Sequence, residues 1–215
     1  KILANSEALK KAPLNDYKDF ITYNNLTFIY FPTLYDFAVI NIIDYLDNFL
    51  NKSTFRLSIC DYEKLISTPI AYSNKEEERI NNLFKDIISF HVNDSAPLIY
   101  WDLIRLKWII ENTPSDEWSN TTRNIVEAVE LLYHKHEHSE YASHALIFLA
   151  NNTYTHYYTN QKKEFYNLLN ERLKRFPAFD QNCEIEHIIN RISQKKLSLT
   201  FDNYIAPNDE LKIKL

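Results

Sequence analysis

The histidine-rich segment at residues 134–144 (HKHEHSEYASH) is the part of this sequence whose residue types are best suited to chemistry. It holds four of the seven histidines in the 215-residue chain. Glu130, His134 and His138 are spaced four residues apart, so on a helix they lie along one stripe, one turn from each other. Carboxylate and imidazole groups are ligands for zinc, iron and manganese. The spacing therefore predicts a metal site for a metal-dependent hydrolase or oxygenase.

The same three residues also fit the polar face of an ordinary surface helix. The stripe continues backwards through Glu127 and Arg123, and it lies opposite an apolar arc that includes Ile125, Val129 and Leu132. The zinc-protease motif H-E-x-x-H is absent from the sequence. We favour the solvated polar face, and the metal site stays as the alternative.

The two cysteines, Cys60 and Cys183, are isolated and form no C-x-x-C motif. Cys183 and His187 are one helical turn apart, a spacing that permits a thiolate–imidazole pair. No third residue that would orient such a pair is identifiable, so we favour a structural thiol. Two isolated cysteines fit a reducing compartment, and we expect a cytoplasmic protein.

Five residues are candidates for contacting a partner protein. Asp102 and Arg105 interrupt the otherwise apolar segment 97–111, where they form either a buried ion pair or a charged groove for a partner. Tyr154, Tyr157 and Tyr158 form an aromatic group, and tyrosine is enriched at protein interfaces. We predict these five residues as the partner-binding set.

The chain contains no glycine. Loops that bring the backbone close to a phosphate need glycine, because a side chain would block the approach or forbid positive φ. This absence excludes the Walker A loop, the dinucleotide-binding fingerprint and the G-x-S-x-G nucleophile elbow. We therefore predict no cofactor.

The N-terminal third of the chain predicts two short strands and one helix. Residues 26–31 (LTFIYF) are β-branched and aromatic, and residues 54–60 (TFRLSIC) alternate apolar and polar residues, as strands do. Residues 34–50 have helical periodicity, with a polar half that includes Asp36. The apolar half, which we expect to be buried, consists of Leu34, Tyr35, Ala38, Val39, Ile42, Ile43, Tyr45, Leu46, Phe49 and Leu50.

From residue 73 onward the sequence predicts helices joined by short polar loops. Segment 97–111 is apolar nearly all round, so we expect it to be the central helix. The others are one that begins after Ser73 or Asn74, then 114–138, 139–158, 161–175 and 183–195. The predicted fold is mainly α, a helical bundle or irregular helical-hairpin array with a small β-containing N-terminal segment. We divide it into residues 1–72 and 73–215, packed together as one domain.

The charge of the chain limits its partners. It has 24 Lys and Arg against 29 Asp and Glu, a net charge of −5. Basic residues form small clusters and no continuous stripe, so we expect no nucleic-acid partner. One such cluster is Lys162, Lys163, Arg172, Lys174 and Arg175. The longest apolar runs fall far short of the roughly 20 residues that cross a bilayer, so we expect no membrane partner.

Two function classes remain after these exclusions. We favour a non-enzymatic protein-binding module of the cytosol, such as an adaptor or an immunity protein that neutralises a toxin as its inhibitor. Mild acidity and abundant tyrosine suit a basic or mixed-charge protein partner. The alternative is the metal-dependent hydrolase or oxygenase built on Glu130, His134 and His138.

Overall fold

The computed structural model describes residues 6–21, 27–48, 75–113, 118–152 and 162–194, and within these ranges every regular element is a helix. The helices are α1 (Ser6–Lys11), α2 (Thr27–Tyr30), α3 (Leu34–Asp47), α5 (Lys75–Phe90), α6 (Ser95–Asn112), α7 (Trp118–Lys135), α8 (Ser143–Asn152), α10 (Lys162–Arg175) and α11 (Asn182–Ser193), with the 3-10 turns η2 (Leu14–Tyr17) and η3 (Glu140–Ala142). The mainly helical fold expected from the sequence is confirmed.

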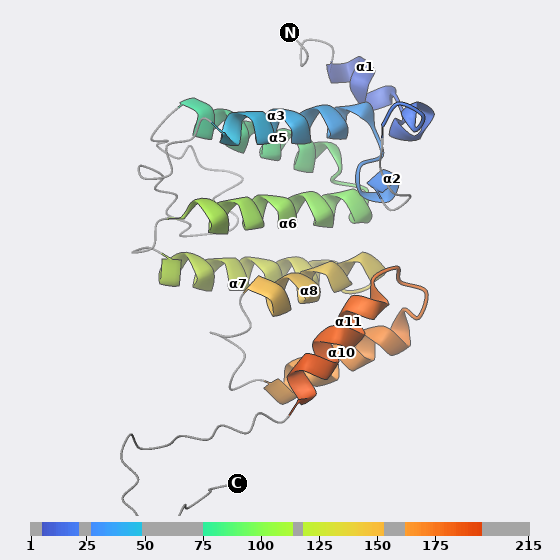
Figure 1. The fold of residues 1–215 in the computed structure, drawn as a ribbon, viewed down its shortest axis with the longest axis vertical. Coiled ribbons are helices and arrows are strands. Elements are labelled where there is room, and N and C mark those ends of the chain that lie inside the picture. Colours follow the sequence, from blue (N-terminus) through green and yellow to red (C-terminus); the bar gives the residue numbers. More distant parts are fainter. Residues whose placement is uncertain (1–5, 22–26, 49–74, 114–117, 153–161, 195–215) are drawn as a thin grey trace, which may run out of the picture.

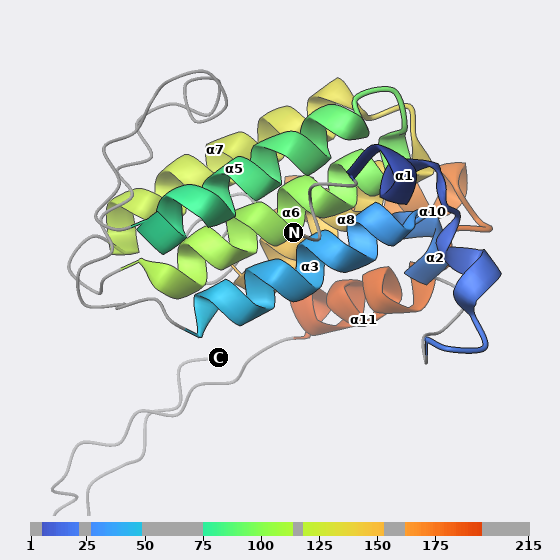
Figure 2. The ribbon, with the colours of Figure 1, turned by 90° about the horizontal axis from the view of Figure 1, so that it is seen from above.

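The helices are stacked in layers along the long axis of the molecule. In Figure 1, α1, α3 and α5 lie at one end, α6 comes next, α7 and α8 follow, and α10 and α11 lie at the other end. Figure 2, seen from above, shows α3 and α5 nearest the viewer, with α6 visible between them. The contacts follow this order, since α5 packs on α3 and α6, α6 on α7 and α8, and α11 on α8 and α10.

Helix α6 is enclosed by its neighbours, as the sequence predicts for residues 97–111. Trp101, Leu106 and Ile109 are fully buried, and Trp108 is 6% exposed. The ring of Phe84, from α5, contacts Trp101 with centroids 6.4 Å apart. Despite its apolar surface, neither α6 nor any other described helix is long and apolar enough to cross a membrane.

The strand predicted for residues 26–31 is wrong, because these residues contribute to the short helix α2. The Tyr30 ring stacks on Tyr100 of α6 with centroids 4.5 Å apart, and the Phe31 ring packs edge-on against Trp101 at 5.2 Å. A lone strand leaves its backbone donors and acceptors without partners. Burying the aromatic rings against α6 while the backbone pairs within a helical turn avoids that cost.

The described residues contain no β-sheet. They contain one isolated antiparallel bridge, between Pro13 and Thr33. The second predicted strand, 54–60, lies outside the described residues, as does the boundary expected at residue 72. Helix α3, from before that boundary, packs on α5, from after it. Buried side chains of both helices belong to one hydrophobic core.

The start of α3 is tied to α6 by the carboxylate of Asp36. Thr33 and Asp36 form a capping box, in which the Thr33 backbone N–H donates to Asp36 Oδ2 at 3.0 Å. His91 Nε2 and Trp101 Nε1 each donate to Oδ1 at 2.7 Å. The helical wheel places Asp36 on the solvent face, and this prediction is wrong: Asp36 is 0% exposed. Polarity alone does not reveal that buried donors elsewhere in the chain surround a carboxylate.

We predict that Trp101→Ala lowers the free energy of unfolding by about 3 to 5 kcal/mol, because it empties a large buried volume. The measurement is urea denaturation followed by far-UV circular dichroism. Phe20→Ala is the matched control, since that ring is 88% exposed, and its effect should stay within about 0.5 kcal/mol. A Trp101→Ala loss of only a few tenths would show that this ring is not part of the core.

Candidate functional site

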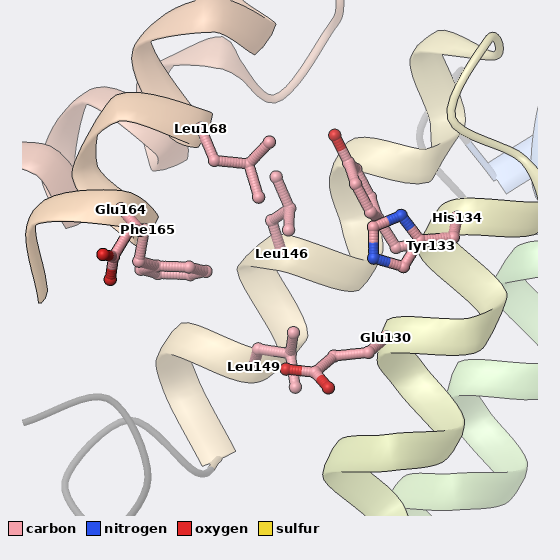
Figure 3. Close-up of a pocket in the computed structure, with 8 residues that line it drawn as sticks. All are labelled: Glu130, Tyr133, His134, Leu146, Leu149, Glu164, Phe165 and Leu168. Atoms are coloured by element: carbon pink, nitrogen blue, oxygen red, sulfur yellow. The ribbon is translucent and has the colours of Figure 1, made fainter. Parts of the chain in front are cut away.

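A pocket of about 160 Å³ lies between α7, α8 and α10 (Figure 3). Its apolar wall is Leu146, Leu149, Phe165 and Leu168, and its polar groups are Glu130, Tyr133, His134 and Glu164. Leu146, Leu149 and Phe165 are almost fully buried and belong to the hydrophobic core. The pocket therefore combines an apolar floor with a polar rim.

The structure brings Glu130 and His134 to this pocket but leaves His138 outside its lining. Helix α7 ends before His138, which lies in the following turn with Nδ1 3.0 Å from Nη2 of Arg175. The His134 side chain is 69% exposed, and its Nδ1 lies 3.9 Å from the Glu137 carboxylate. The helix predicted to run to residue 138 is thus too long at its C-terminal end.

The predicted metal centre of Glu130, His134 and His138 is not assembled in this structure. Among the described residues, no three His, Cys, Asp or Glu side chains are grouped closely enough to hold a metal ion. His134 and His138 are exposed and Glu130 is half-buried. This is the environment expected for the polar edge of a surface helix.

Arg172 of α10 determines the path of the chain after α7. Its side chain is 1% exposed. Nη1 donates to the carbonyl of Glu137 at 2.7 Å, Nη2 to the carbonyl of Ser139 at 2.5 Å, and Nε to Ser143 Oγ at 3.0 Å. The guanidinium also lies over the Phe176 ring, 4.2 Å from its centroid. These bonds connect α10 to the turn between α7 and η3.

Sequence reasoning missed Arg172 because the sequence shows it only as one member of a small basic cluster. The signal that could have found it is spacing, since Arg172 follows Phe165 and Leu169 on the same face of α10. Both of those residues are buried. Burial also raises the pKa of Tyr133, although the charge of Arg172 opposes that shift.

The structure describes two of the five predicted partner-binding residues, Asp102 and Arg105. Asp102 and Arg105 are buried, and the Arg105 guanidinium donates two bonds to Asp102 Oδ1, at 2.9 and 2.7 Å. They form the buried ion pair that the sequence left open, and a partner could reach neither without rearrangement. Tyr154, Tyr157 and Tyr158 lie outside the described residues.

A larger hollow of about 480 Å³ lies along the outer side of α3, next to α1. We call it the α1–α3 groove, and it is lined by Leu9, Leu34, Phe37, Ala38, Asn41, Ile42 and Tyr45. The expectation that Leu34, Ala38, Ile42 and Tyr45 are buried is wrong: the first three are partly exposed and Tyr45 is 63% exposed. Helix α3 is apolar over more of its circumference than its neighbours cover.

The last turn of α3 is acidic. Helix α3 has no Lys or Arg, and it carries Asp44 and Asp47, of which Asp47 accepts hydrogen bonds from Trp108 and Asn112 of α6. Burial and the neighbouring Asp47 charge raise the pKa of Asp44. Figures 1 and 2 place the first turn of α5, with Glu76 and Glu78, at the same end of the molecule. A cation is therefore favoured near the C-terminal end of α3.

Tyr30, His144 and Asp180 form a hydrogen-bonded chain that links α2, α8 and the segment before α11. The Tyr30 hydroxyl donates to Asp180 Oδ2 at 3.0 Å, and His144 Nε2 lies 2.7 Å from the same hydroxyl. Because the phenol has one proton, His144 Nε2 must donate to it. Burial lowers the pKa of His144 to about 4, so the imidazole is neutral at pH 7.

No family model, curated protein or solved structure matches this chain. What it does therefore has to be inferred from its own side chains and surfaces. The described residues form an apolar groove on α3 and a pocket with a polar rim.

We predict that stability decreases as the pH falls from about 6.5 to about 4, because the unfolded state binds a proton that folded His144 excludes. A shift of this size corresponds to at most about 3.4 kcal/mol. His144→Gln keeps a donor for Tyr30 but cannot titrate, so its stability should change less over this range. The measurement is urea denaturation at several pH values.

His134→Gln is the control, because it removes an exposed imidazole. It should retain the pH dependence of the unchanged protein. Equal pH dependence in His144→Gln and the unchanged protein would contradict the role given to His144.

Proposed function

We propose that this chain is a non-enzymatic protein-binding module that holds an apolar segment of a basic protein in the α1–α3 groove. The observation that carries the proposal is the apolar stripe of α3. Leu34, Ala38, Ile42 and Tyr45 follow one another at helical spacing and remain accessible. Contiguous apolar surface of this kind marks interaction sites, and a groove on a helix suits the apolar face of a partner helix.

Charge supports a basic partner. Asp44 lies in the last turn of α3, one residue before Tyr45 of the groove, and partial burial and the neighbouring Asp47 charge raise its pKa. A lysine or arginine of the partner would relieve that repulsion. The net charge of −5 acts in the same direction over longer distances and speeds encounter with a basic protein.

The groove is also held in place before any partner arrives. The opposite side of α3 is buried, and Asp36 connects it to His91 and Trp101 by 2.7 Å bonds. A preformed surface loses less conformational freedom when it binds, which favours affinity.

This architecture suits an adaptor or an inhibitor, such as an immunity protein that neutralises a basic toxin. We place it in the cytosol, where an exposed free thiol such as that of Cys183 stays reduced. The alternative metal-dependent hydrolase or oxygenase receives less support, because no three metal-ligating side chains of the described residues are grouped closely enough to hold an ion.

The test uses two helical peptides with the same leucine face, one carrying lysine and the other glutamate on the polar face. We expect the leucine–lysine peptide to bind at least about tenfold more tightly, measured by fluorescence anisotropy. Ile42→Lys places a cation in the groove and should weaken that binding by about tenfold or more, or roughly 1.4 kcal/mol.

Leu131→Lys is the matched control, since Leu131 is an exposed leucine on α7, outside the groove. It should leave the affinity unchanged. Equal affinities for the two peptides, or equal effects of Ile42→Lys and Leu131→Lys, would contradict the proposal.

A further inference from the structure

The α1–α3 groove has one amide among its apolar and aromatic lining residues, and that amide is Asn41. Asn41 is exposed and lies within residues 34–45, the part of α3 that lines the groove. Ala38 precedes it by three positions and Tyr45 follows it by four, so the three residues share one side of the helix. A helix that docks along the groove therefore covers Asn41.

The Asn41 side chain has a defined orientation. Its Nδ2 donates to the carbonyl of Phe37 at 2.6 Å. A carbonyl oxygen only accepts, so the amide nitrogen must face Phe37 and Oδ1 must point away from it. Among the described residues, no group donates to Oδ1. This exposed acceptor is hydrated until a partner covers it.

Covering Oδ1 with an apolar side chain is unfavourable. The partner would displace water and leave a carbonyl acceptor without a donor, which costs more than an ordinary hydrogen bond contributes. An asparagine in the apolar seam of a coiled coil has the same effect, and it fixes the register of the two helices. The groove therefore favours a partner that places one donor opposite Asn41.

Asp44 determines the charge of that donor. It follows Asn41 by three positions, so the two side chains are neighbours on the surface of α3. Asp44 is exposed, and α3 has no Lys or Arg to neutralise it. A cationic donor complements the Asp44 charge while it pairs with Asn41, whereas a neutral donor satisfies Asn41 alone.

Arginine meets both requirements. Its N–H groups are spread over a planar fork, so they reach two acceptors together, and its methylene stem packs on apolar surface. We propose that the segment bound in the α1–α3 groove carries one arginine within its apolar face, and that the guanidinium donates to Asn41 Oδ1 beside the Asp44 carboxylate. This inference rests on the proposed function and adds the partner residue that sets the register.

The test replaces the central leucine on the apolar face of the leucine–lysine peptide by arginine or by citrulline, which has nearly the same shape but no charge. We expect the arginine peptide to bind at least about fivefold more tightly than the leucine parent, with citrulline in between, in fluorescence anisotropy. The gain from leucine to citrulline reports the donor for Asn41, and the gain from citrulline to arginine reports the charge of Asp44. A leucine parent that binds as tightly as the arginine peptide would overturn the inference.

Asn41→Leu removes the acceptor, so it should reverse the order and make the leucine parent the tighter ligand. Asn170→Leu is the matched control, because Asn170 of α10 makes the same kind of bond, to the carbonyl of Tyr166 at 2.8 Å, and does not line the groove. It should keep the preference for arginine. Equal peptide preferences in Asn41→Leu and Asn170→Leu would overturn the role of Asn41.

Asp44→Asn should bring the affinities for the arginine and citrulline peptides within about twofold of each other. An arginine preference that survives this change would overturn the role of Asp44. If the leucine parent binds and Ile42→Lys weakens it, but arginine gives no gain, the groove binds a helix and only the arginine is wrong. If no peptide binds the unchanged protein, the proposed function and the arginine are both wrong.

Discussion

The carboxylate of Asp36 is the group on which the position of α3 depends. It is fully buried and accepts hydrogen bonds from Thr33 at the start of α3, from His91 after α5 and from Trp101 in α6. A buried carboxylate is tolerated only when its oxygens have donors. Any rotation of α3 about its axis would break several of these bonds together. One side chain therefore sets both where α3 begins and which side of it faces the core.

That orientation produces the groove. With Asp36, Val39 and Ile43 turned inward, Ala38 and Tyr45 necessarily face outward on a helix that is apolar on both sides. Arg172 has a comparable role at the other end of the molecule, where it binds the turn after α7 and holds α10 beside α7 and α8. Each candidate binding surface thus borders a buried polar side chain that fixes the helices around it.

Periodicity and capping residues predicted most of the long helices, and the apolar circumference of residues 97–111 predicted that α6 is central. The errors concern interactions between distant residues. Asp36 is hydrogen-bonded to His91 and Trp101, which are 55 and 65 positions away in the sequence, so a helical wheel assigns Asp36 to the solvent face.

The strand predicted for residues 26–31 is wrong because the aromatic rings of these residues pack on α6. The stripe of Glu130, His134 and His138 assumes a helix that continues to residue 138, whereas α7 ends at Lys135. The groove was not predicted, because the sequence shows that a helix face is apolar but does not show whether another helix covers it.

The free energy of unfolding of Asp36→Asn tests this account most directly. Asparagine has the same shape but replaces one accepting oxygen by a donating amide, which faces donors that then have no acceptor. The account predicts a loss of about 3 to 5 kcal/mol in urea denaturation, as found when a buried charged pair is broken. Asp44→Asn, at an exposed position of the same helix, should stay within about 0.5 kcal/mol of the unchanged protein. Equal stabilities of Asp36→Asn and Asp44→Asn would contradict the central role of Asp36.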